Sequence, residues 1–415
     1  MATGFAGHRG MLPRRLTPLR ATFAAAVLSI AATAQTTLSV GTRAVAWANP
    51  TAHGSVTLAA TVHYPALTAG VDVPLLPRPG GWPVVVFLHG YGLLGNAYAA
   101  LAGAWASSGF VVVLSDTCQF DWDCQEQDGR ALYSAVIAQN AATTSPFFGA
   151  FDVARIGLAG HSMGGTSIGN LLAANPGYRC AMTLAPATPF GSNASAITIP
   201  FGIVVGEADN VTPPLGYAQP YYNAVTSHGS LKFLYLLDAA CDHLNVSGLT
   251  PLPWSPVTTQ VFERSVAVSR GFLQHCLRAG PTGLESAIGP AALADPHFSS
   301  LQREALIPQM WTDARFRLGT STRVSIAIEG AFAGLFASPA AIAPFPTGIG
   351  DLEIDPTLAF SLGIGFSNPD QRVDLVVNIP NDPLLLGTDV AMQSLGETPV
   401  GVVKLSNPVF LPIEP

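Results

Sequence analysis

Short runs of β-branched residues, separated by helical stretches, constrain the fold of this chain more than any other feature. Residues 83–88 (PVVVFL) and 110–114 (FVVVL) are apolar without interruption. Strands have this composition when helices cover both faces of a parallel sheet. Residues 96–108, which lie between the two runs, have a helical pattern. Two neighbouring parallel strands joined by a crossover helix are therefore expected.

The same alternation continues to about residue 280. It predicts an α/β domain over residues 35–280, with a doubly wound, mostly parallel sheet and helices on both faces. An edge-type strand is expected at residues 55–64. Further strands are expected at residues 155–159, 200–205 and 231–237, and further helices at residues 129–140, 166–174 and 258–279.

The pattern changes after residue 280. Residues 281–315 mix Pro, Ala and charged residues, which predicts a linker with one or two short helices. Residues 316–415 favour a small all-β, sandwich-like domain. His297 is the last histidine of the chain, so we expect this domain to bind a surface or to stabilise the protein rather than to catalyse. Its strands are expected at residues 323–329, 357–364, 372–379 and 400–405.

The N-terminal 34 residues have the pattern of an export signal. Arginines precede an apolar run over residues 21–32, and Ala32-Thr33-Ala34 provides small residues for cleavage. The run is shorter than the ~20 residues that span a bilayer. We therefore expect a secreted protein without a transmembrane segment.

The charge of the remaining chain argues against nucleic acid as a partner. Residues 1–34 carry four Arg and no acidic residue, so the rest has 15 basic against 26 acidic residues and a net charge of −11. Nucleic-acid binding depends on Lys and Arg that neutralise phosphates. The whole chain contains two Lys.

Five cysteines leave at least one unpaired in a monomer, the state that we expect. Cys118 and Cys124 are close enough in sequence to close a small loop, and Cys241 and Cys276 can tie a loop to the following helix. Disulfides are compatible with export. Because the chain has no Cys-x-x-Cys pair and no matching His cluster, we expect no metal and no other cofactor.

The sequence GHSMGG at residues 160–165 carries the strongest chemical signal. It follows an expected strand and precedes an expected helix, which is the setting of the G-x-S-x-G nucleophile elbow. Small residues are needed there because the strained turn brings backbone segments close together. We therefore expect Ser162 to be a nucleophile.

A serine hydroxyl needs a base to react at neutral pH. In this fold the chain order is Ser, then acid, then His. Asp209 follows the strand at residues 200–205, and His243 follows the strand at residues 231–237. Both loops lie at the carboxyl edge of the sheet. Asp209 is expected to orient His243 and to stabilise its protonated form.

Other acids and histidines are weaker candidates. Asp238 and Glu207 remain open as the acid, whereas Asp242 adjoins His243 too closely to orient it. His228 precedes a strand and His275 falls within the closing helix, so neither is expected near Ser162.

The loop His89-Gly90-Tyr91-Gly92 follows the strand at residues 83–88. Two backbone N–H groups aimed at a developing oxyanion stabilise it by a few kcal/mol. We expect these donors from Met163 and Tyr91. His89 is expected to hold the loop, and His161 to pack within the elbow.

An ordered series of motifs resembles the bacterial cutinases and related polyester (PET) hydrolases. The resemblance covers about residues 55–280. It implies Ser162, Asp209 and His243 as the triad, with Tyr91 and Met163 as oxyanion donors. The motifs are VHYP, HGYG, SSGFVVVLSDT, DGRAL, GHSMGG, GEADNVTPP and CDHLNV.

Two features depart from this family. Ala187 stands where the family carries a Trp in the substrate cleft, so one aromatic wall of the cleft is missing. We expect Tyr91 and Ala187 to contact the substrate. The segment from Cys118 to Cys124 is also unusual.

These observations predict a secreted serine ester hydrolase that is cutinase-like or polyesterase-like and acts through an acyl-enzyme on a polymeric or lipidic ester. A lipase, a phospholipid-type esterase and a chlorophyllase-like esterase share the same elbow. A non-catalytic surface-binding protein is the alternative of another class.

Overall fold

The computed structural model describes residues 37–49, 57–174, 177–187, 193–226, 231–277, 282–398 and 400–415. The export signal predicted over residues 1–34 lies outside them. Within the described residues, no helix is both long enough and apolar enough to cross a membrane.

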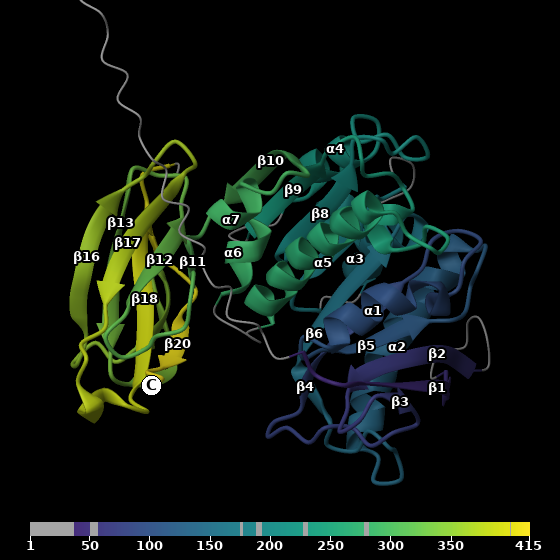
Figure 1. Ribbon diagram of the computed structural model, residues 1–415, viewed down its shortest axis with the longest axis horizontal. Helices are drawn as coiled ribbons and strands as arrows, with labels where there is room; N and C mark the ends of the chain where they lie inside the picture. Colours follow the sequence, from purple (N-terminus) through teal and green to yellow (C-terminus); the bar gives the residue numbers. More distant parts are fainter. Residues whose placement is uncertain are drawn as a thin grey trace, which may run out of the picture. The chain divides into compact units, whose positions relative to one another are not determined.

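A ten-stranded sheet in the order β10-β9-β8-β7-β6-β4-β5-β2-β1-β3 forms the centre of the larger part (Figure 1). The six strands from β9 to β5 in this order pair in parallel. A mixed α/β architecture with a largely parallel sheet is therefore confirmed. These strands are β4 (Trp82–Leu88), β5 (Val111–Ser115), β6 (Phe151–His161), β7 (Ala181–Leu184), β8 (Phe201–Gly206) and β9 (Leu231–Leu237).

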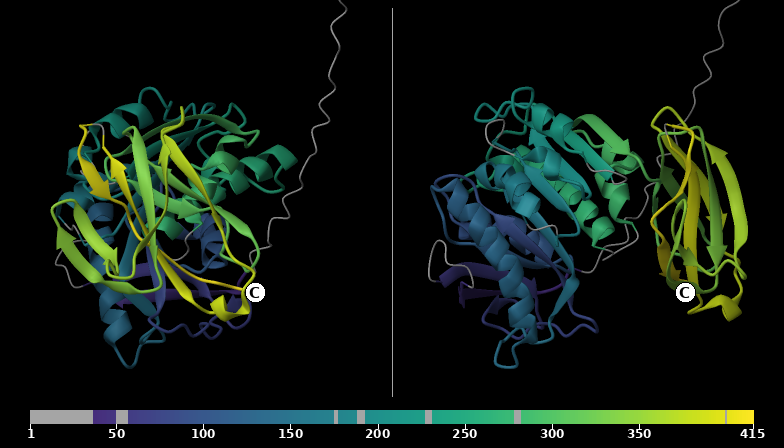
Figure 2. Two further views of the ribbon diagram at one scale, coloured as in Figure 1. Left: turned by 90° about the vertical axis from the view of Figure 1, so that its left-hand side faces the viewer. Right: turned by 180° about the vertical axis from the view of Figure 1, so that it is seen from behind.

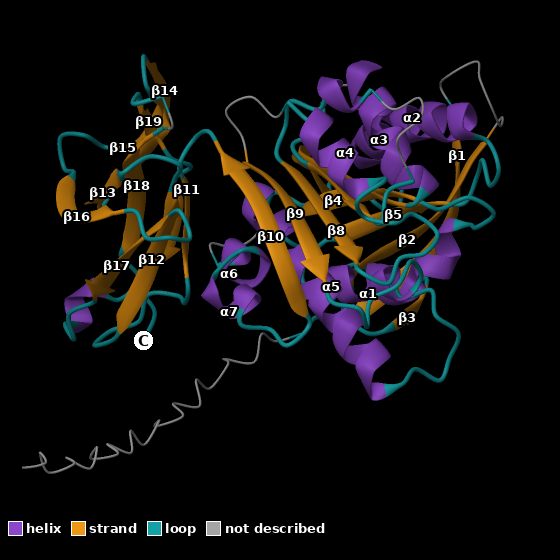
Figure 3. Cartoon of the chain, turned by 90° about the horizontal axis from the view of Figure 1, so that it is seen from above, coloured by secondary structure: helices purple, strands orange, loops and turns teal. Residues whose placement is uncertain are grey.

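Helices cover both faces of this sheet, which explains the uninterrupted apolar strands. Figure 3 shows α1 and α5 on one face and α2, α3 and α4 on the other. Their bounds are α1 (Ala99–Ala106, after the 3₁₀ turn η1, Gly95–Tyr98), α2 (Trp122–Ala141), α3 (Met163–Ala174), α4 (Ala218–Ala224) and α5 (Pro256–Cys276). Helix α2 starts well before the predicted residue 129, because the Asp121 carboxylate accepts a hydrogen bond from the Cys124 N–H and caps the helix.

The edges of the sheet differ from the prediction. The strand that we expected at an edge of the sheet is β2 (Thr57–Pro65). The predicted edge position was wrong, because β1 (Val40–Ala48) pairs with β2 along the whole length of β2, and β3 (Gly70–Val71) lies beyond β1. At the other edge, β10 (Phe298–Ala305) pairs antiparallel with β9. Strand β10 falls within the segment interpreted as a linker. Its sequence FSSLQREA lacks the apolar run of a doubly covered strand.

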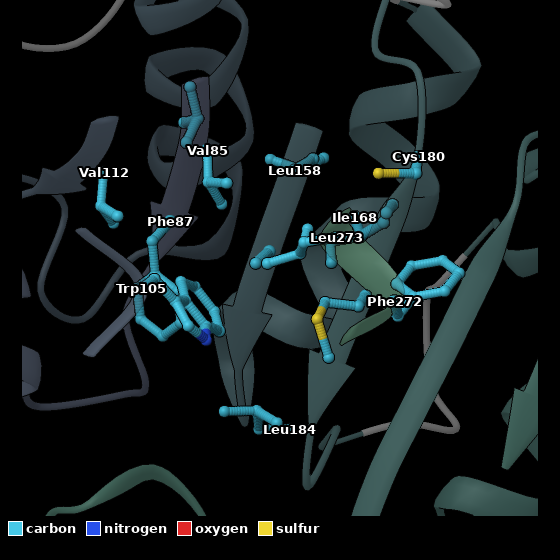
Figure 4. Close-up of a cluster of buried hydrophobic side chains, with 14 of the residues drawn as sticks. Val85, Phe87, Trp105, Val112, Leu158, Ile168, Cys180, Leu184, Phe272 and Leu273 are labelled. Carbon is cyan, nitrogen blue, oxygen red and sulfur yellow. The ribbon is translucent and has the colours of Figure 1, made fainter. Parts of the chain in front are cut away.

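Large apolar side chains from both helix layers and the strands between them form the core (Figure 4). Phe87, Leu158, Trp105 and Phe272 are fully buried. Burying a side chain of this size contributes about 1.5–3 kcal/mol. The Trp105 indole N–H donates to the Ser269 hydroxyl at 3.0 Å, which joins α1 to α5. The sheet is thereby a rigid platform for the loops at its carboxyl edge.

The C-terminal residues form antiparallel sheets, so an all-β domain is confirmed. One sheet has the order β11-β12-β17 and another the order β16-β13-β18-β19, with β20 paired to β18. Figure 2 draws the strands of this part in light green to yellow. Their inward side chains, such as Ile326 and Leu335, share one buried cluster. Six of the ten strands from β11 to β20 were not predicted, among them the Gly- and Ala-rich β13 and also β11, which falls within the segment interpreted as a linker. The bounds are β11 (Gln309–Thr312), β12 (Ser321–Ala327), β13 (Phe332–Ser338), β14 (Ala341–Thr347), β15 (Gly350–Ile354), β16 (Phe360–Phe366), β17 (Arg372–Asn378), β18 (Asp389–Glu397), β19 (Val403–Leu405) and β20 (Val409–Pro412), with the short helices α6 (Gly283–Ala287) and α7 (Pro290–Leu293) before them.

One of the two cysteine pairings that we considered is present. Cys118 and Cys124 form a disulfide. Cys241 and Cys276 are both free thiols, so that pairing was wrong. Cys241 follows β9 at the carboxyl edge, whereas Cys276 ends α5, whose 21 residues run roughly 30 Å away from that edge. Cys276 instead lies beside Cys180.

Candidate active site

Three loops at the carboxyl edge of the sheet carry Ser162, Asp209 and His243. They follow β6, β8 and β9, respectively. The Asp209 and His243 loops are joined by a hydrogen bond from the Ala208 N–H to the Cys241 carbonyl at 3.0 Å. Ser162, Asp209 and His243 are all at least nine-tenths buried.

Ser162 occupies a strained turn between β6 and α3. Its φ of 53° lies in the left-handed region, which non-Gly residues rarely adopt. A Cβ added to Gly164 would lie 2.2 Å from the Leu88 carbonyl oxygen, and one added to Gly160 would lie 2.5 Å from the Gly164 backbone. Only glycine fits both positions, which is why the elbow needs them.

Backbone hydrogen bonds hold the elbow on both sides. The Ser162 N–H donates to the Leu184 carbonyl, and the Ala187 N–H donates to the Ser162 carbonyl, each at 3.1 Å. Ala187, which replaces the expected aromatic residue, therefore lies against the elbow with a methyl group as its side chain.

The His243 ring is oriented by a carboxylate. His243 Nδ1 lies 2.8 Å from Asp209 Oδ2. A carboxylate only accepts hydrogen bonds, so the proton of the neutral ring resides on Nδ1 and the lone pair on Nε2. This is the tautomer that a general base needs.

Asp209 is held as an anion by several donors. Its Oδ1 accepts from the N–H groups of Val211 at 3.0 Å and Thr212 at 2.7 Å, and its Oδ2 accepts from the Thr212 hydroxyl at 2.8 Å. Burial acts to raise the pKa of Asp209, but the hydrogen bonds from His243 and Thr212 outweigh it and lower the pKa. Sequence reasoning missed Thr212, whose signal is an Asp followed three residues later by Thr.

The competing acids have other partners. Asp238 Oδ2 lies 3.1 Å from His297 Nδ1, and the Glu207 carboxylate accepts from the Ser299 hydroxyl. His275 lies 3.0 Å from the Gln309 side chain. His228 lies outside the described residues. Of the candidate acids within the described residues, only Asp209 lies at a ring nitrogen of His243.

The loop after β4 approaches the elbow. A Cβ added to Gly90 would lie 3.3 Å from Ser162 Cβ. Tyr91, the next residue, is exposed, and Met163 is the first residue of α3, where N–H groups have no partner within the helix. His89 Nε2 lies 2.6 Å from the Thr117 carbonyl, which ties the loop to the segment after β5.

His161 does more than pack within the elbow. Its Nε2 donates to the His243 carbonyl at 2.9 Å, and its Nδ1 accepts from the Tyr98 hydroxyl at 2.9 Å. The Tyr98 oxygen accepts in turn from the Gly90 N–H at 2.8 Å. A buried chain of hydrogen bonds thus connects the His89–Gly92 loop to the backbone of His243. Burial, followed by the proximity of His243, lowers the pKa of His161 to about 3, so this ring is neutral.

The polar contacts of the His243 ring within the described residues run through Nδ1, and none joins Nε2 to the Ser162 hydroxyl. Hydrogen bonds of this kind are commonly long before substrate binds and tighten in the reacting complex.

One group of potential metal ligands lies together within the described residues: Cys118, Cys124 and Asp128. The two sulfurs form the disulfide and offer no thiolate. This donor set does not fit a metal ion.

Comparison with known proteins identifies the family of the chain. The model of a family described as PETase, PET hydrolase-like, matches residues 25–252, more than half of the chain. The chain belongs to the PET hydrolase-like family.

Characterised relatives are similar over shorter stretches. A bis(hydroxyethyl) terephthalate hydrolase from Streptomyces coelicolor is 28% identical over 47% of this chain and 59% of its own length. Cutinase est1 from Thermobifida alba is 29% identical over 39% of this chain and 54% of its own length. A cutinase from Thermobifida fusca is 32% identical over 32% of this chain and 43% of its own length. The chain thus spans about half the length of these relatives.

The buried neutral His161 predicts a specific pH dependence of stability. Burial also lowers the pKa of His63 to about 4. Between pH 6.5 and these values the unfolded chain binds protons that the folded chain does not, so the free energy of unfolding falls as the pH falls. Each such histidine contributes a slope of about 1.4 kcal/mol per pH unit. The free energy of unfolding of His161→Asn, measured by urea denaturation between pH 6 and 4.5, should depend on pH with a slope that is smaller by about that amount than in the unmodified protein.

Gln125→Asn is the matched control, because Gln125 is fully buried and hydrogen-bonded but does not titrate. It should keep the slope of the unmodified protein. An unchanged slope in His161→Asn would show that His161 is protonated in the folded protein.

Proposed function

We propose that this protein is a secreted carboxylic ester hydrolase of the α/β-hydrolase fold, with Ser162 as nucleophile, His243 as general base and Asp209 as the residue that orients His243. The observation that carries the proposal is the hydrogen bond of 2.8 Å between Asp209 and His243. The loops of these two residues lie next to the turn of Ser162, whose backbone is in the left-handed region. Export rests on the pattern in residues 1–34.

The reaction follows from the positions of the protons. With Nδ1–H bound to Asp209, His243 Nε2 takes the Ser162 proton as Oγ attacks the ester carbonyl carbon. The tetrahedral intermediate then expels the alcohol, which receives that proton from Nε2, and an acyl-enzyme remains. Water attacks the acyl group with His243 again as base, and Ser162 leaves with the proton while the acid is released.

The oxyanion of each tetrahedral intermediate is assigned to the backbone N–H groups of Met163 and Tyr91. The start of α3 adds a partial positive charge at the same point. The chain from Gly90 through Tyr98 and His161 supports this assignment, because it keeps the His89–Gly92 loop in register with the backbone of His243.

The substrate class that we propose is a polymeric or lipidic carboxylic ester. The names of relatives, cutinases and a bis(hydroxyethyl) terephthalate hydrolase, support it. A lipase or a phospholipid-type or chlorophyllase-like esterase would use the same three residues. Assays with polyester films, triglycerides and phospholipids in parallel separate these classes.

Ser162→Ala tests the central assignment. Hydrolysis of p-nitrophenyl butyrate should fall by about 10³-fold or more in kcat, because the attacking hydroxyl is removed. Ser195→Ala, which removes an exposed serine, should leave the rate unchanged. Full activity in Ser162→Ala would rule out the mechanism, and a wild-type protein without turnover would favour a non-catalytic binding protein.

The C-terminal sandwich-like domain is proposed to hold the enzyme on a solid substrate. Strand β16 is the edge strand of its sheet. Phe366 pairs opposite Phe332, and Ile364 opposite Gly334, so these side chains share one face. Their exposed fractions are 81% for Phe366, 67% for Ile364 and 36% for Phe332. Exposed apolar patches of this kind mark interaction sites.

Replacing Phe332, Ile364 and Phe366 with Ser should lower adsorption to a polyester film several-fold, because the apolar contact area is lost. Hydrolysis of soluble esters should be unchanged. Leu384→Ser with Val400→Ser removes two other exposed apolar side chains and should adsorb like the wild type. Equal adsorption by all three proteins would refute the role of this face.

A further inference from the structure

The loop closed by the Cys118–Cys124 disulfide has no role in the reaction as described above. It separates β5 from α2 and starts at Cys118, which has a φ of 60°. At its far end the Cys124 N–H donates to the Asp121 carboxylate, which begins α2. The disulfide therefore fixes both ends of a short segment that contains Gln119 and Phe120.

This segment is hydrogen-bonded to the loop that carries Tyr91. The Gly92 N–H donates to the Gln119 carbonyl at 2.9 Å, and the Gln119 side-chain amide donates to the Gly92 carbonyl at 2.7 Å. A third bond joins His89 Nε2 to the Thr117 carbonyl at 2.6 Å. The two loops thus form one unit beside Ser162.

The unit presents two aromatic rings to solvent. The Phe120 and Tyr91 rings lie edge to face, with centroids 5.3 Å apart and an interplanar angle of 76°. Phe120 is 59% exposed and Tyr91 is 60% exposed. A Cβ added to Gly92, which has a φ of 76°, would lie 3.5 Å from the Phe120 ring. The ring therefore lies directly over the loop that continues from Tyr91.

Other exposed apolar side chains follow the remaining candidate residues. Val211 lies two residues after Asp209, and Leu244 follows His243 directly. With Phe120 and Tyr91, these exposed apolar side chains come from four loops that follow strands at the same edge of the sheet.

We propose that Phe120, held by the Cys118–Cys124 disulfide, forms with Tyr91 an aromatic wall that binds the aryl ring of an ester's acyl group. The inference rests on the proposed function and assigns Phe120 as a residue that determines which acyl group binds. Aromatic rings prefer edge-to-face and offset contacts at the spacing of this pair, so a third ring gains more from this wall than an alkyl chain does.

Phe120→Ala tests the wall with two esters that differ only in the acyl group, ethyl benzoate and ethyl butyrate. We expect KM for ethyl benzoate to rise about 3- to 10-fold with kcat nearly unchanged, since a ring contact is lost from bound substrate and transition state alike. Values for ethyl butyrate should change little. Phe120→Tyr should retain the preference for benzoate.

Phe148→Ala is the matched control. Phe148 is 55% exposed, close to the exposure of Phe120, but it precedes β6 and so lies at the opposite edge of the sheet. It should not alter either ester. Equal losses on both esters in Phe120→Ala, or no loss on either, would overturn the aromatic wall.

The disulfide is tested by replacing Cys118 and Cys124 together with Ser. This variant should lose the benzoate preference as Phe120→Ala does, and a retained preference would contradict the role of the disulfide. Calorimetric binding of ethyl benzoate to Ser162→Ala, compared with Ser162→Ala/Phe120→Ala, requires no turnover. Weaker binding in the double variant supports the wall even where the proposed hydrolysis fails. Equal binding overturns the wall even where hydrolysis is found.

Discussion

The hydrogen bond between Asp209 and His243 is the constraint on which the rest of the site depends. It joins loops that follow two adjacent parallel strands, and it has meaning only because the sheet keeps β8 and β9 in register. Thr212 and the backbone of its loop keep Asp209 ionised, and this charge fixes the proton of His243 on Nδ1. The buried core beneath supplies the rigidity that such a geometry requires.

Much of this arrangement is readable from the sequence because parallel strands leave a strong local signal. The apolar runs of β4 and β5 and the glycines beside Ser162 each have one dominant physical explanation. Because Ser162, Asp209 and His243 each follow a parallel strand, their loops are expected at one edge of the sheet. Predicting that these loops lie together requires only the direction of the strands, and it requires no knowledge of side-chain contacts.

What sequence reasoning missed depends on contacts between distant residues. Strand β10 carries polar residues and lies at the edge of the sheet, so its sequence has no apolar run from which a strand could be predicted. The link from His161 to the His243 carbonyl spans 82 positions in the chain. The rejected pairing of Cys241 with Cys276 failed because the length of α5, rather than spacing in the sequence, decides where Cys276 lies. Residues 316–415 are all-β as predicted. Strand β13 was missed because its small residues do not give the apolar pattern of a strand.

The most direct measurement is a crystal structure of the protein after reaction with an aryl organophosphonate, which imitates the tetrahedral intermediate. The account predicts a covalent bond from phosphorus to Ser162 Oγ, with the phosphoryl oxygen accepting from the N–H groups of Met163 and Tyr91. His243 Nε2 should lie within hydrogen-bond distance of the oxygen bound to phosphorus. An adduct on another residue, or a His243 ring directed away from the adduct, would contradict it.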